Sequence, residues 1–282
     1  MFLVSTQIYI DLSEKSFFRK IKLVKQSWFE KQYLGSWLQN KLLSKKWESY
    51  VDMYCRQGNS LALGKSYTEQ DYLSFTPKIG EQLNFKDGDS IFDNGCGCGA
   101  FLAAFNRSYK NVQVGGLDLS KGAIKFAKEI FPAEKKNFRV GTVEDLYFIK
   151  DKTYDHAMTF FTFPYVKPEV QCKAVKEMLR IVKPGGSLYV GHNLETGCAE
   201  NHIGIYTLPL CFWNEKCLKD AKDVAQILYI KEKELFGVVK YCPEKTAVFI
   251  YKKTSSGNEK IPDHTAAYKC RSLYPPVGRR KP

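Results

Sequence analysis

The residues best suited to chemistry form a run of alternating glycines directly after an apolar segment. Residues 91–105 read IFDNGCGCGAFLAAF, in which Asp93 is followed by Gly95, Gly97 and Gly99. Glycine has no Cβ, so the backbone at these positions can come close to a ligand. The apolar residues that follow predict a helix, whose first N–H groups and partial positive charge attract a carboxylate or a phosphate. The segment therefore indicates a strand, a ligand-binding turn and a helix.

A second carboxylate, Asp118, ends the next apolar segment, in the string GLDLS. In a doubly wound sheet, an acidic residue at this place lies beside the glycine turn and can accept hydrogen bonds from ribose hydroxyls. Alternatively, the role of Asp118 could be limited to capping the helix that follows, but Ser120 can cap that helix equally well. We expect a nucleoside-containing ligand at the switch point of the sheet.

The choice among nucleoside ligands depends on the residues around the glycines. Gly95, Gly97 and Ala100 fit the loose dinucleotide pattern G-x-G-x-x-G/A, which is weak on its own. Asp93 precedes the first glycine by two positions, where a carboxylate would repel a pyrophosphate and attract an ammonium group. A Lys-Pro-Gly-Gly turn at 183–186 also does not belong to the dinucleotide pattern. An oxidoreductase is therefore a remote alternative.

The elements that must position these residues alternate along the chain. Short apolar runs predict strands at 90–94, 112–119, 137–143, 154–163 and 187–193. Amphipathic segments predict helices at 69–83, 100–109, 121–131 and 168–182. This alternation is typical of a parallel sheet covered by helices on both faces, and β-rich segments at 225–234 and 246–253 could add an antiparallel edge strand. We expect an α/β, doubly wound, mostly parallel, seven-stranded Rossmann-like sheet.

Taken together, these motifs resemble the class I S-adenosylmethionine-dependent methyltransferases, and most of all their small-molecule group. DNGCGCG resembles the first motif of that family, GLDLS resembles the second, and EMLRIVKPGGSLYV is similar to the KPGG signature. The resemblance covers about residues 85–195, with weaker support to 253. It implies S-adenosyl-L-methionine as the cofactor and transfer of a methyl group to a small-molecule acceptor by in-line displacement.

The resemblance also implies a set of cofactor-binding residues. These are Asp93, Gly95, Cys96, Gly97, Asp118, Leu119, Val143, Glu144 and Thr159. The turn would line the methionine part through its backbone, and Asp93 would face the ammonium group. Asp118 would bind the ribose hydroxyls and Leu119 would pack on the adenine. Thr159 and Phe160, at the end of the fourth strand, would lie near the transferable methyl group.

One position departs from the family pattern. The family usually has an acidic residue directly after the glycine of GTVEDL, and here that residue is Thr142. The usual contact with the adenine amino group is therefore in doubt. Glu144 or Asp145 could replace it, or the backbone of Val143 could make the contact alone.

A general base is not an essential part of this chemistry. The methyl donor is already activated, so proximity, orientation and exclusion of water could suffice. His192, Asn193 and Glu195 follow the fifth predicted strand at the ligand-binding edge, and His192 is the candidate catalytic residue. We expect His156, within a strand, to be structural.

Two further patterns could be functional, but each also has an ordinary structural interpretation. The string TFPY at 162–165 only partly resembles the motif of amino-group methyltransferases, because it lacks the leading amide or acid and one proline. Aromatic residues in the N-terminal part could roof a substrate pocket, but at helical spacing they are more often core. These residues are Trp28, Trp37, Trp47, Tyr50 and Tyr54.

The charge of the chain is concentrated at its ends. Of the net charge of +13, residues 1–46 and 252–282 carry +6 each, and the middle is nearly neutral. A catalytic domain that grips a polyanion usually has its own basic face. This favours a small-molecule acceptor over RNA or protein. In the second hypothesis, the acceptor is RNA or protein and the basic ends bind it. A non-catalytic methyltransferase-like binding domain is the third hypothesis.

Composition and cysteine usage set the broad class. Apolar residues make up 44% and charged residues 26% of the 282 residues, which is ordinary globular usage. The nine cysteines are scattered without a C-x-x-C pair, so we expect free thiols, no metal site and a cytoplasmic protein. Cys96 and Cys98 would be small space-fillers. The start lacks the features of a signal peptide, and no apolar run is long enough to span a bilayer.

The expected organisation has three parts. Residues 1–75 would form an N-terminal helical extension, in which 47–75 is the candidate lid. Residues 76–253 would form the S-adenosylmethionine-binding domain, and 254–282 a basic, disordered tail.

Overall fold

A computed structural model describes most of the chain between residues 65 and 253. It covers 65–194, 224–237 and 246–253, with residue 55 and short pieces at 60–62, 206, 208, 212–218 and 221. The segment 1–46, the tail 254–282 and the five aromatic residues between Trp28 and Tyr54 lie outside the described residues. Among the helices that are described, none has the length and apolar character that a bilayer crossing requires.

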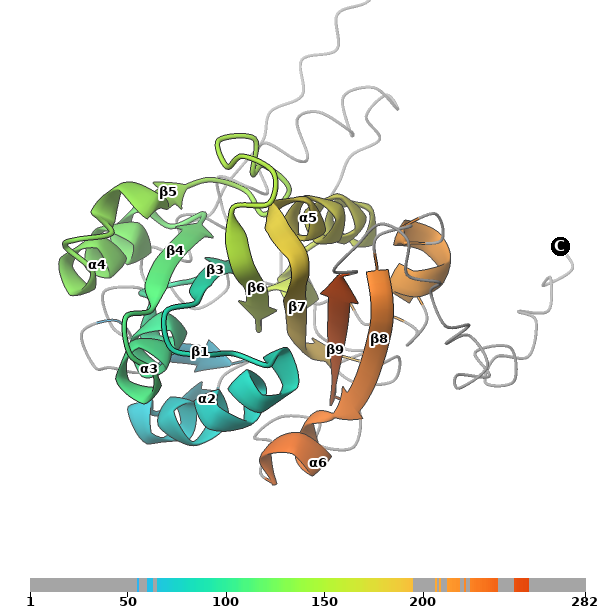
Figure 1. Cartoon of the computed structure of the whole chain (residues 1–282), viewed down its shortest axis with the longest axis horizontal. Helices are drawn as coiled ribbons and strands as arrows, with labels where there is room; N and C mark the ends of the chain where they lie inside the picture. Colours follow the sequence, from blue (N-terminus) through green and yellow to red (C-terminus); the bar gives the residue numbers. More distant parts are fainter. Residues whose placement is uncertain are drawn as a thin grey trace, which may run out of the picture. The chain divides into compact units, whose positions relative to one another are not determined.

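Seven strands form one mixed sheet in the order β5-β4-β3-β6-β7-β9-β8 (Figure 1). Its strands are β3 (Ser90–Asn94), β4 (Gln113–Asp118), β5 (Phe138–Val140), β6 (Tyr154–Phe160), β7 (Val182–Leu194), β8 (Val224–Lys231) and β9 (Thr246–Lys253). The first five run parallel, whereas β9 pairs antiparallel with both β7 and β8. The predicted mostly parallel sheet is confirmed, and its antiparallel strand lies next to the edge.

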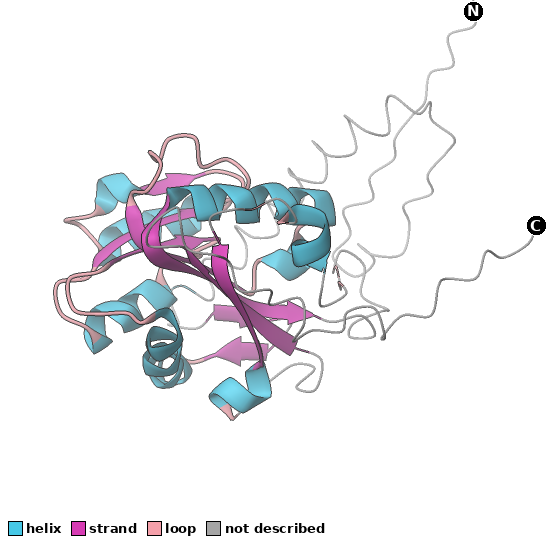
Figure 2. Cartoon of the chain, turned by 45° about the vertical axis from the view of Figure 1, so that its right-hand side comes forward, coloured by secondary structure: helices cyan, strands magenta, loops and turns pink. Residues whose placement is uncertain are grey.

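Helices cover both faces of the sheet, as the alternating pattern predicted (Figure 2). They are α2 (Glu69–Leu83), α3 (Ala100–Ser108), α4 (Lys121–Ile130), α5 (Pro168–Ile181) and α6 (Glu232–Phe236). Consecutive residues of a strand point to opposite faces, so Ile91 and Phe92, both fully buried, belong to two different core clusters. The first cluster includes residues of α2, α3, α4 and α6, and the second includes residues of α5.

Helix α2 joins the N-terminal side of the chain to the core. Thr68 begins it with a capping box, in which its side chain and that of Asp71 each accept a hydrogen bond from the other's backbone N–H. Phe75, Ile79 and Leu83 recur every four residues and are buried. The helix therefore continues across the boundary expected between residues 75 and 76.

Four short elements lack a sequence signal strong enough to predict them. A hairpin of β1 (Ser60–Ala62) and β2 (Lys65–Tyr67) precedes α2. A π-helix, Trp213–Cys217, packs beside α5, and α6 directly follows β8. The predicted Lys-Pro-Gly-Gly turn is the irregular first part of the long strand β7, where Gly185 has a φ of 77°.

The expectation that the cysteines are free is wrong for four of them. Disulfide bonds join Cys55 to Cys98 and Cys172 to Cys217. The partners are 43 and 45 residues apart, so only the fold brings them together. The expected reducing, cytoplasmic location was based on free thiols, so these bonds no longer support that expectation.

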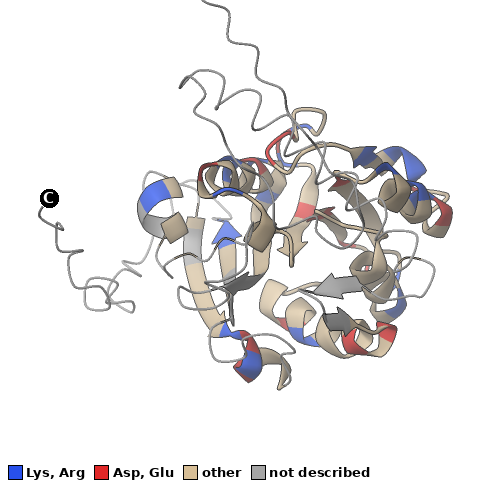
Figure 3. Cartoon of the chain, turned by 180° about the vertical axis from the view of Figure 1, so that it is seen from behind, with Lys and Arg blue, Asp and Glu red and all other residues tan. Residues whose placement is uncertain are grey.

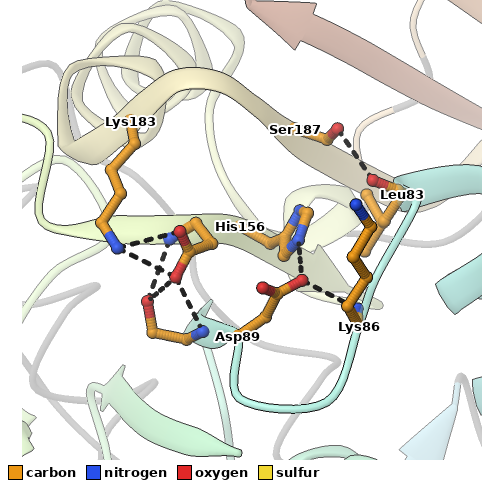
Figure 4. Close-up of polar contacts among 8 residues, drawn as sticks. Leu83, Lys86, Asp89, His156, Lys183 and Ser187 are labelled. Carbon is orange, nitrogen blue, oxygen red and sulfur yellow. Dashed lines mark hydrogen bonds and ion pairs between the residues drawn. The ribbon is translucent and has the colours of Figure 1, made fainter.

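A polar network fastens the amino ends of β3, β6 and β7 (Figure 4). The carboxylate of Asp155 accepts hydrogen bonds from Lys183 Nζ at 2.8 and 3.0 Å and from Ser90 Oγ at 2.6 Å. His156 Nε2 lies 3.1 Å from Asp89 Oδ2. Burial lowers the pKa of His156, although Asp89 acts in the opposite direction. This supports the structural role expected for His156.

Asp155→Asn tests the strength of this network. Burial raises the pKa of Asp155, but hydrogen bonds from Lys183 and Ser90 outweigh burial and lower it. We expect the variant to lose about 1 kcal/mol of unfolding free energy at pH 7, measured by urea denaturation. The charged form is the stabilised one, so the difference from wild type should shrink as the pH falls below about 4.

Asp151→Asn is the matched control. Its carboxylate is paired with Arg180 at 2.7 Å, but 69% of the side chain is exposed, so its loss should be small. Equal destabilisation by the two substitutions, or a difference at Asp155 that does not depend on pH, would contradict this account.

Candidate functional site

The carboxyl ends of β3 and β4 meet at the glycine turn. In the parallel pairing of these strands, Asp93 lies opposite Gly116 and Asn94 opposite Leu117. The N–H groups of Gly95 and Cys96 both donate to the carbonyl oxygen of Leu117, at 2.7 and 2.9 Å. The turn is therefore attached to the last residues of β4.

Three glycines of the turn have backbone conformations that other residues rarely adopt. The φ angles are 93° at Gly95, 51° at Gly97 and 82° at Gly99. A Cβ on Gly95 would collide with the side chain of Thr162, but a Cβ on Gly97 would meet nothing within 4 Å. The backbone at Gly97 consequently borders open space, which a ligand could occupy.

Asp118 connects the turn to the following helix. Its Oδ2 accepts a hydrogen bond from Gly97 N–H and its Oδ1 accepts one from Ser120 N–H, both at 2.9 Å. Ser120 is itself the N-cap of α4, since its hydroxyl accepts from Ala123 N–H. Burial raises the pKa of Asp118, although the N–H groups of Ser120 and Gly97 partly offset this. The helix therefore has its cap without Asp118.

Asp93 is the buried acid of the site. It is 3% exposed, and its Oδ1 has no hydrogen-bond partner among the described residues. Burial, and then the nearby charge of Asp118, raise the pKa of Asp93 well above its usual range. A cation beside Asp93 would favour its ionised form. Tyr72 of α2 is close enough for the charge of Asp93 to contribute to its raised pKa, after burial and Tyr67.

The turn after β5 is attached to the end of β3 and contains an internal backbone hydrogen bond. The carbonyl oxygen of Val143 accepts a hydrogen bond from Asn94 Nδ2 at 2.8 Å, and Asp145 N–H donates to Thr142 O at 2.9 Å. Glu144 is half-buried, and Asp145 is exposed. Val143 and Asn94 thus connect the end of β3 to this turn, whereas no described contact joins Glu144 to Asp118.

Thr159 lies on the face of the sheet away from Asp93. Met158 is paired with Asp93 and shares its face, so Thr159 points the other way. Thr159 is fully buried, and its hydroxyl has no partner among the described residues. His192 lies in β7, but its side chain, like that of Asn193, is not described, and Glu195 lies outside the described residues.

Aromatic rings from several elements gather where β6 ends, a feature that the sequence did not reveal. The ring of Tyr67 lies 5.4 Å from that of Phe161 and 6.1 Å from that of Phe160. Phe75 of α2 stacks on Phe236 of α6 at 4.2 Å. Phe161 has a φ of 63°, which is unusual for an aromatic residue. Strained backbone conformations of this kind are often found at functional sites.

The TFPY string is mostly used in packing. Thr162 Oγ1 donates to Gly95 O at 3.3 Å, so it touches the turn. Phe163 and Pro164 are buried, and Phe163 packs against Trp213 with 5.7 Å between ring centroids. The geometry favours a structural role for Phe163 and Pro164.

The remaining thiol of the turn is a packing group. Cys96 is 6% exposed, and its Sγ would lie only 2.7 Å from a Cβ on Gly116. Burial, together with the charges of Asp118 and Asp93, raises the pKa of the Cys96 thiol. Within the described part of the chain, no group of three or more His, Cys, Asp or Glu residues could hold a metal ion.

Comparison with known proteins gives a consistent class. Residues 91–186 match the family model described as a methyltransferase domain. The 2-methyl-6-phytyl-1,4-hydroquinone methyltransferase of Synechocystis is 25% identical over 190 residues, which are 66% of this chain and 56% of that protein. The chain spans between 39% and 56% of the length of the first three curated relatives it matches.

Two solved structures share the fold. One is the partner of the Trm112 methyltransferase activator in a Haloferax volcanii complex, with a TM-score of 0.52, 21% identity, and coverage of 66% of this chain and 91% of that one. The other is a geranyl diphosphate methyltransferase in complex with S-adenosylmethionine, with a TM-score of 0.50, 14% identity, and coverage of 66% and 85%. These findings support a class I S-adenosylmethionine-dependent methyltransferase, whose methyltransferase domain includes residues 91–186.

S-adenosylmethionine fits the residues at this site. The cofactor carries an ammonium group, a sulfonium and two ribose hydroxyls. Asp93 offers an unpartnered buried oxygen, Asp118 offers a second carboxylate, and Gly97 borders open space. A cationic ligand would reduce the repulsion between the two carboxylates.

Gly97→Ala should separate folding from ligand binding. A residue with a Cβ at this positive φ costs about 1–2 kcal/mol of stability, and the added methyl group would enter the open space at the turn. We expect the affinity for S-adenosylmethionine, measured by calorimetry, to fall about tenfold or more.

Gly88→Ala is the matched control. Gly88 also has a positive φ, 87°, and a Cβ there would likewise meet nothing within 4 Å, but it lies before β3. It should lose similar stability and keep its affinity. A similar loss of affinity in both variants would mean that the effect at Gly97 is only structural.

Proposed function

We propose that this protein transfers the methyl group of S-adenosylmethionine to a small-molecule acceptor. The observation that carries the proposal is the arrangement of Asp93 and Asp118 around an open glycine turn, within the methyltransferase domain. The same pair of acids would be costly in a site that bound only an anion, because burial acts against the charge of both and the charge of Asp118 also acts against that of Asp93.

The proposed cofactor residues divide by the part of the cofactor they would hold. Asp93 would face the ammonium group, and the backbone of the turn, including Cys96, would line the methionine part. Asp118 would accept hydrogen bonds from the ribose, and half-buried Leu119 would pack on the adenine. The adenine amino group would be met near Val143 and Glu144.

The cofactor supplies a methyl group already activated on a sulfonium, so the chain need not generate an electrophile. Its residues would bind and orient the acceptor and exclude water. The aromatic cluster at the end of β6, formed by Phe160, Phe161, Tyr67 and Phe236, supports this role because it is buried and apolar. The buried side chain of Thr159 would contribute to packing on the opposite face of β6. If the acceptor must lose a proton, His192 is the proposed base.

Charge supports a small acceptor over a polyanion. Residues 47–251, between the basic ends, are nearly neutral in net charge, whereas RNA phosphates require basic contacts. On the face shown in Figure 3, blue and red segments are interspersed along the helices. The basic ends, at 1–46 and 252–282, remain the proposed arms in the alternative of an RNA or protein acceptor.

Calorimetric titration of the full chain with S-adenosylmethionine and S-adenosylhomocysteine tests the cofactor site. We expect both to bind, and Asp118→Asn to weaken each by about tenfold or more, because it removes a charged hydrogen-bond acceptor. Affinity for S-adenosylmethionine should also fall as the pH is lowered, since the raised pKa of Asp93 makes it lose its charge early.

Asp87→Asn is the control for this experiment. Asp87 also accepts a backbone hydrogen bond, from Lys110 N–H at 2.9 Å, but lies in the loop before β3. It should bind both ligands normally. Failure of the well-folded wild type to bind either ligand would overturn the enzyme proposal and favour a non-catalytic binding domain.

The acceptor class is tested by the salt dependence of binding. A single-stranded RNA oligonucleotide should bind weakly at about 150 mM salt. This is roughly the physiological ionic strength, at which interactions between exposed charges are strongly screened. Tight binding that falls steeply with added salt, and that is lost when residues 254–282 are removed, would overturn the small-molecule proposal in favour of a polyanion.

A further inference from the structure

The disulfide between Cys55 and Cys98 joins the cofactor turn to a segment ahead of the β1–β2 hairpin. The two Cα atoms lie 5.6 Å apart. Cys98 stands between Gly97, whose N–H donates to Asp118, and Gly99, the N-cap of α3. The bond therefore fixes the part of the turn that borders the open space.

This disulfide is placed where a thiol reagent can reach it. Cys55 and Cys98 are both partly exposed. In the other disulfide, Cys172 is also partly exposed, but Cys217 is 4% exposed and lies in the π-helix that packs against α5. Thiol–disulfide exchange requires direct attack on a sulfur atom, so accessibility favours reaction at the first bond.

The surroundings of Cys98 also favour its release as a thiolate. It lies just before α3, which has nine residues, no acidic residue in its first turn and no side-chain cap. The free N–H groups at such a helix start stabilise a negative charge on sulfur. Cys96, in the same turn, is buried and has a raised thiol pKa, so it is a poor competing nucleophile.

We propose that Cys55–Cys98 is a thiol–disulfide exchange site that controls how tightly and how long the methyltransferase cofactor is held. The inference rests on the proposed function, because it concerns the same turn. A turn with three glycines loses much conformational freedom when it orders around a ligand. The covalent bond to Cys55 restricts that freedom beforehand, so the oxidised form should bind more tightly and release more slowly.

The exchange step is a two-electron reduction by a dithiol. A thiolate of the dithiol attacks Cys55 Sγ, the Cys55–Cys98 bond breaks, and Cys98 leaves as a thiolate that takes up a proton. The second thiol of the reductant then displaces Cys55 and closes its own disulfide. The products are two protein thiols and the oxidised dithiol. Oxidised glutathione re-forms the Cys55–Cys98 bond by the same kind of exchange and leaves as two molecules of reduced glutathione.

The test compares the full chain after treatment with oxidised glutathione and after mild treatment with dithiothreitol. Alkylation and mass spectrometry should show that Cys55 and Cys98 become free before Cys172 and Cys217. Stopped-flow release of S-adenosylhomocysteine should be about fivefold or more faster from the reduced form, and calorimetry should show correspondingly weaker binding.

Variants assign the effect to one bond. Cys55→Ser removes the bond without substituting any residue of the turn, and should behave like the reduced form under either treatment. Cys172→Ser is the matched control, because it removes the other disulfide, and should keep the full response. Equal release rates from the two forms of the wild type, a response that persists in Cys55→Ser, or the absence of a Cys55–Cys98 bond after oxidation would overturn the inference. Binding in neither form would instead overturn the proposed function, and with it this inference.

Discussion

The candidate site depends on the hydrogen bond from Gly97 N–H to the carboxylate of Asp118. It fixes the glycine turn of one strand to the end of the next, at 2.9 Å, while Asp118 also accepts from the start of α4. The backbone conformation of Gly97 directs its N–H toward this carboxylate and leaves the other side of the residue open. A single carboxylate thereby sets the relative positions of a turn, a strand end and a helix start.

Holding that bond in place requires strands that cannot shift along one another. The two core clusters bury both faces of β3, and the network around Asp155 and Lys183 fastens the amino ends of β3, β6 and β7. A one-residue shift of a strand would move its core side chains to the opposite face. Rigidity at the amino edge therefore determines geometry at the carboxyl edge, where the proposed ligand-binding residues lie.

The sequence predicted the parts of the molecule whose signals are local. Glycines at positive φ, Asp118 at a strand end and the Lys-Pro-Gly-Gly signature all reflect backbone constraints within a few residues, so the sheet, its helices and the turn were predictable. The disulfide partner of Cys98, the aromatic cluster around Tyr67 and the proximity of Tyr72 to Asp93 arise from contacts between distant segments. Their residue types have ordinary core or thiol interpretations, and no spacing marks them. The facing of Thr159 away from Asp93 required the strand register, which sequence alone does not fix.

The reversed strand β9 has a consequence for how such an enzyme can diversify. Because β9 runs antiparallel to both neighbours, β8 runs in the direction of β7, and Lys231 and Asn193 both pair with Ala247. The chain thus delivers α6, with Phe236, to the edge where the glycine turn lies. One wall of the aromatic cluster is encoded after β7 and the turn is encoded before β4. Insertion, deletion or recombination in the later segment can change the proposed acceptor-binding surface without altering the proposed cofactor-binding residues.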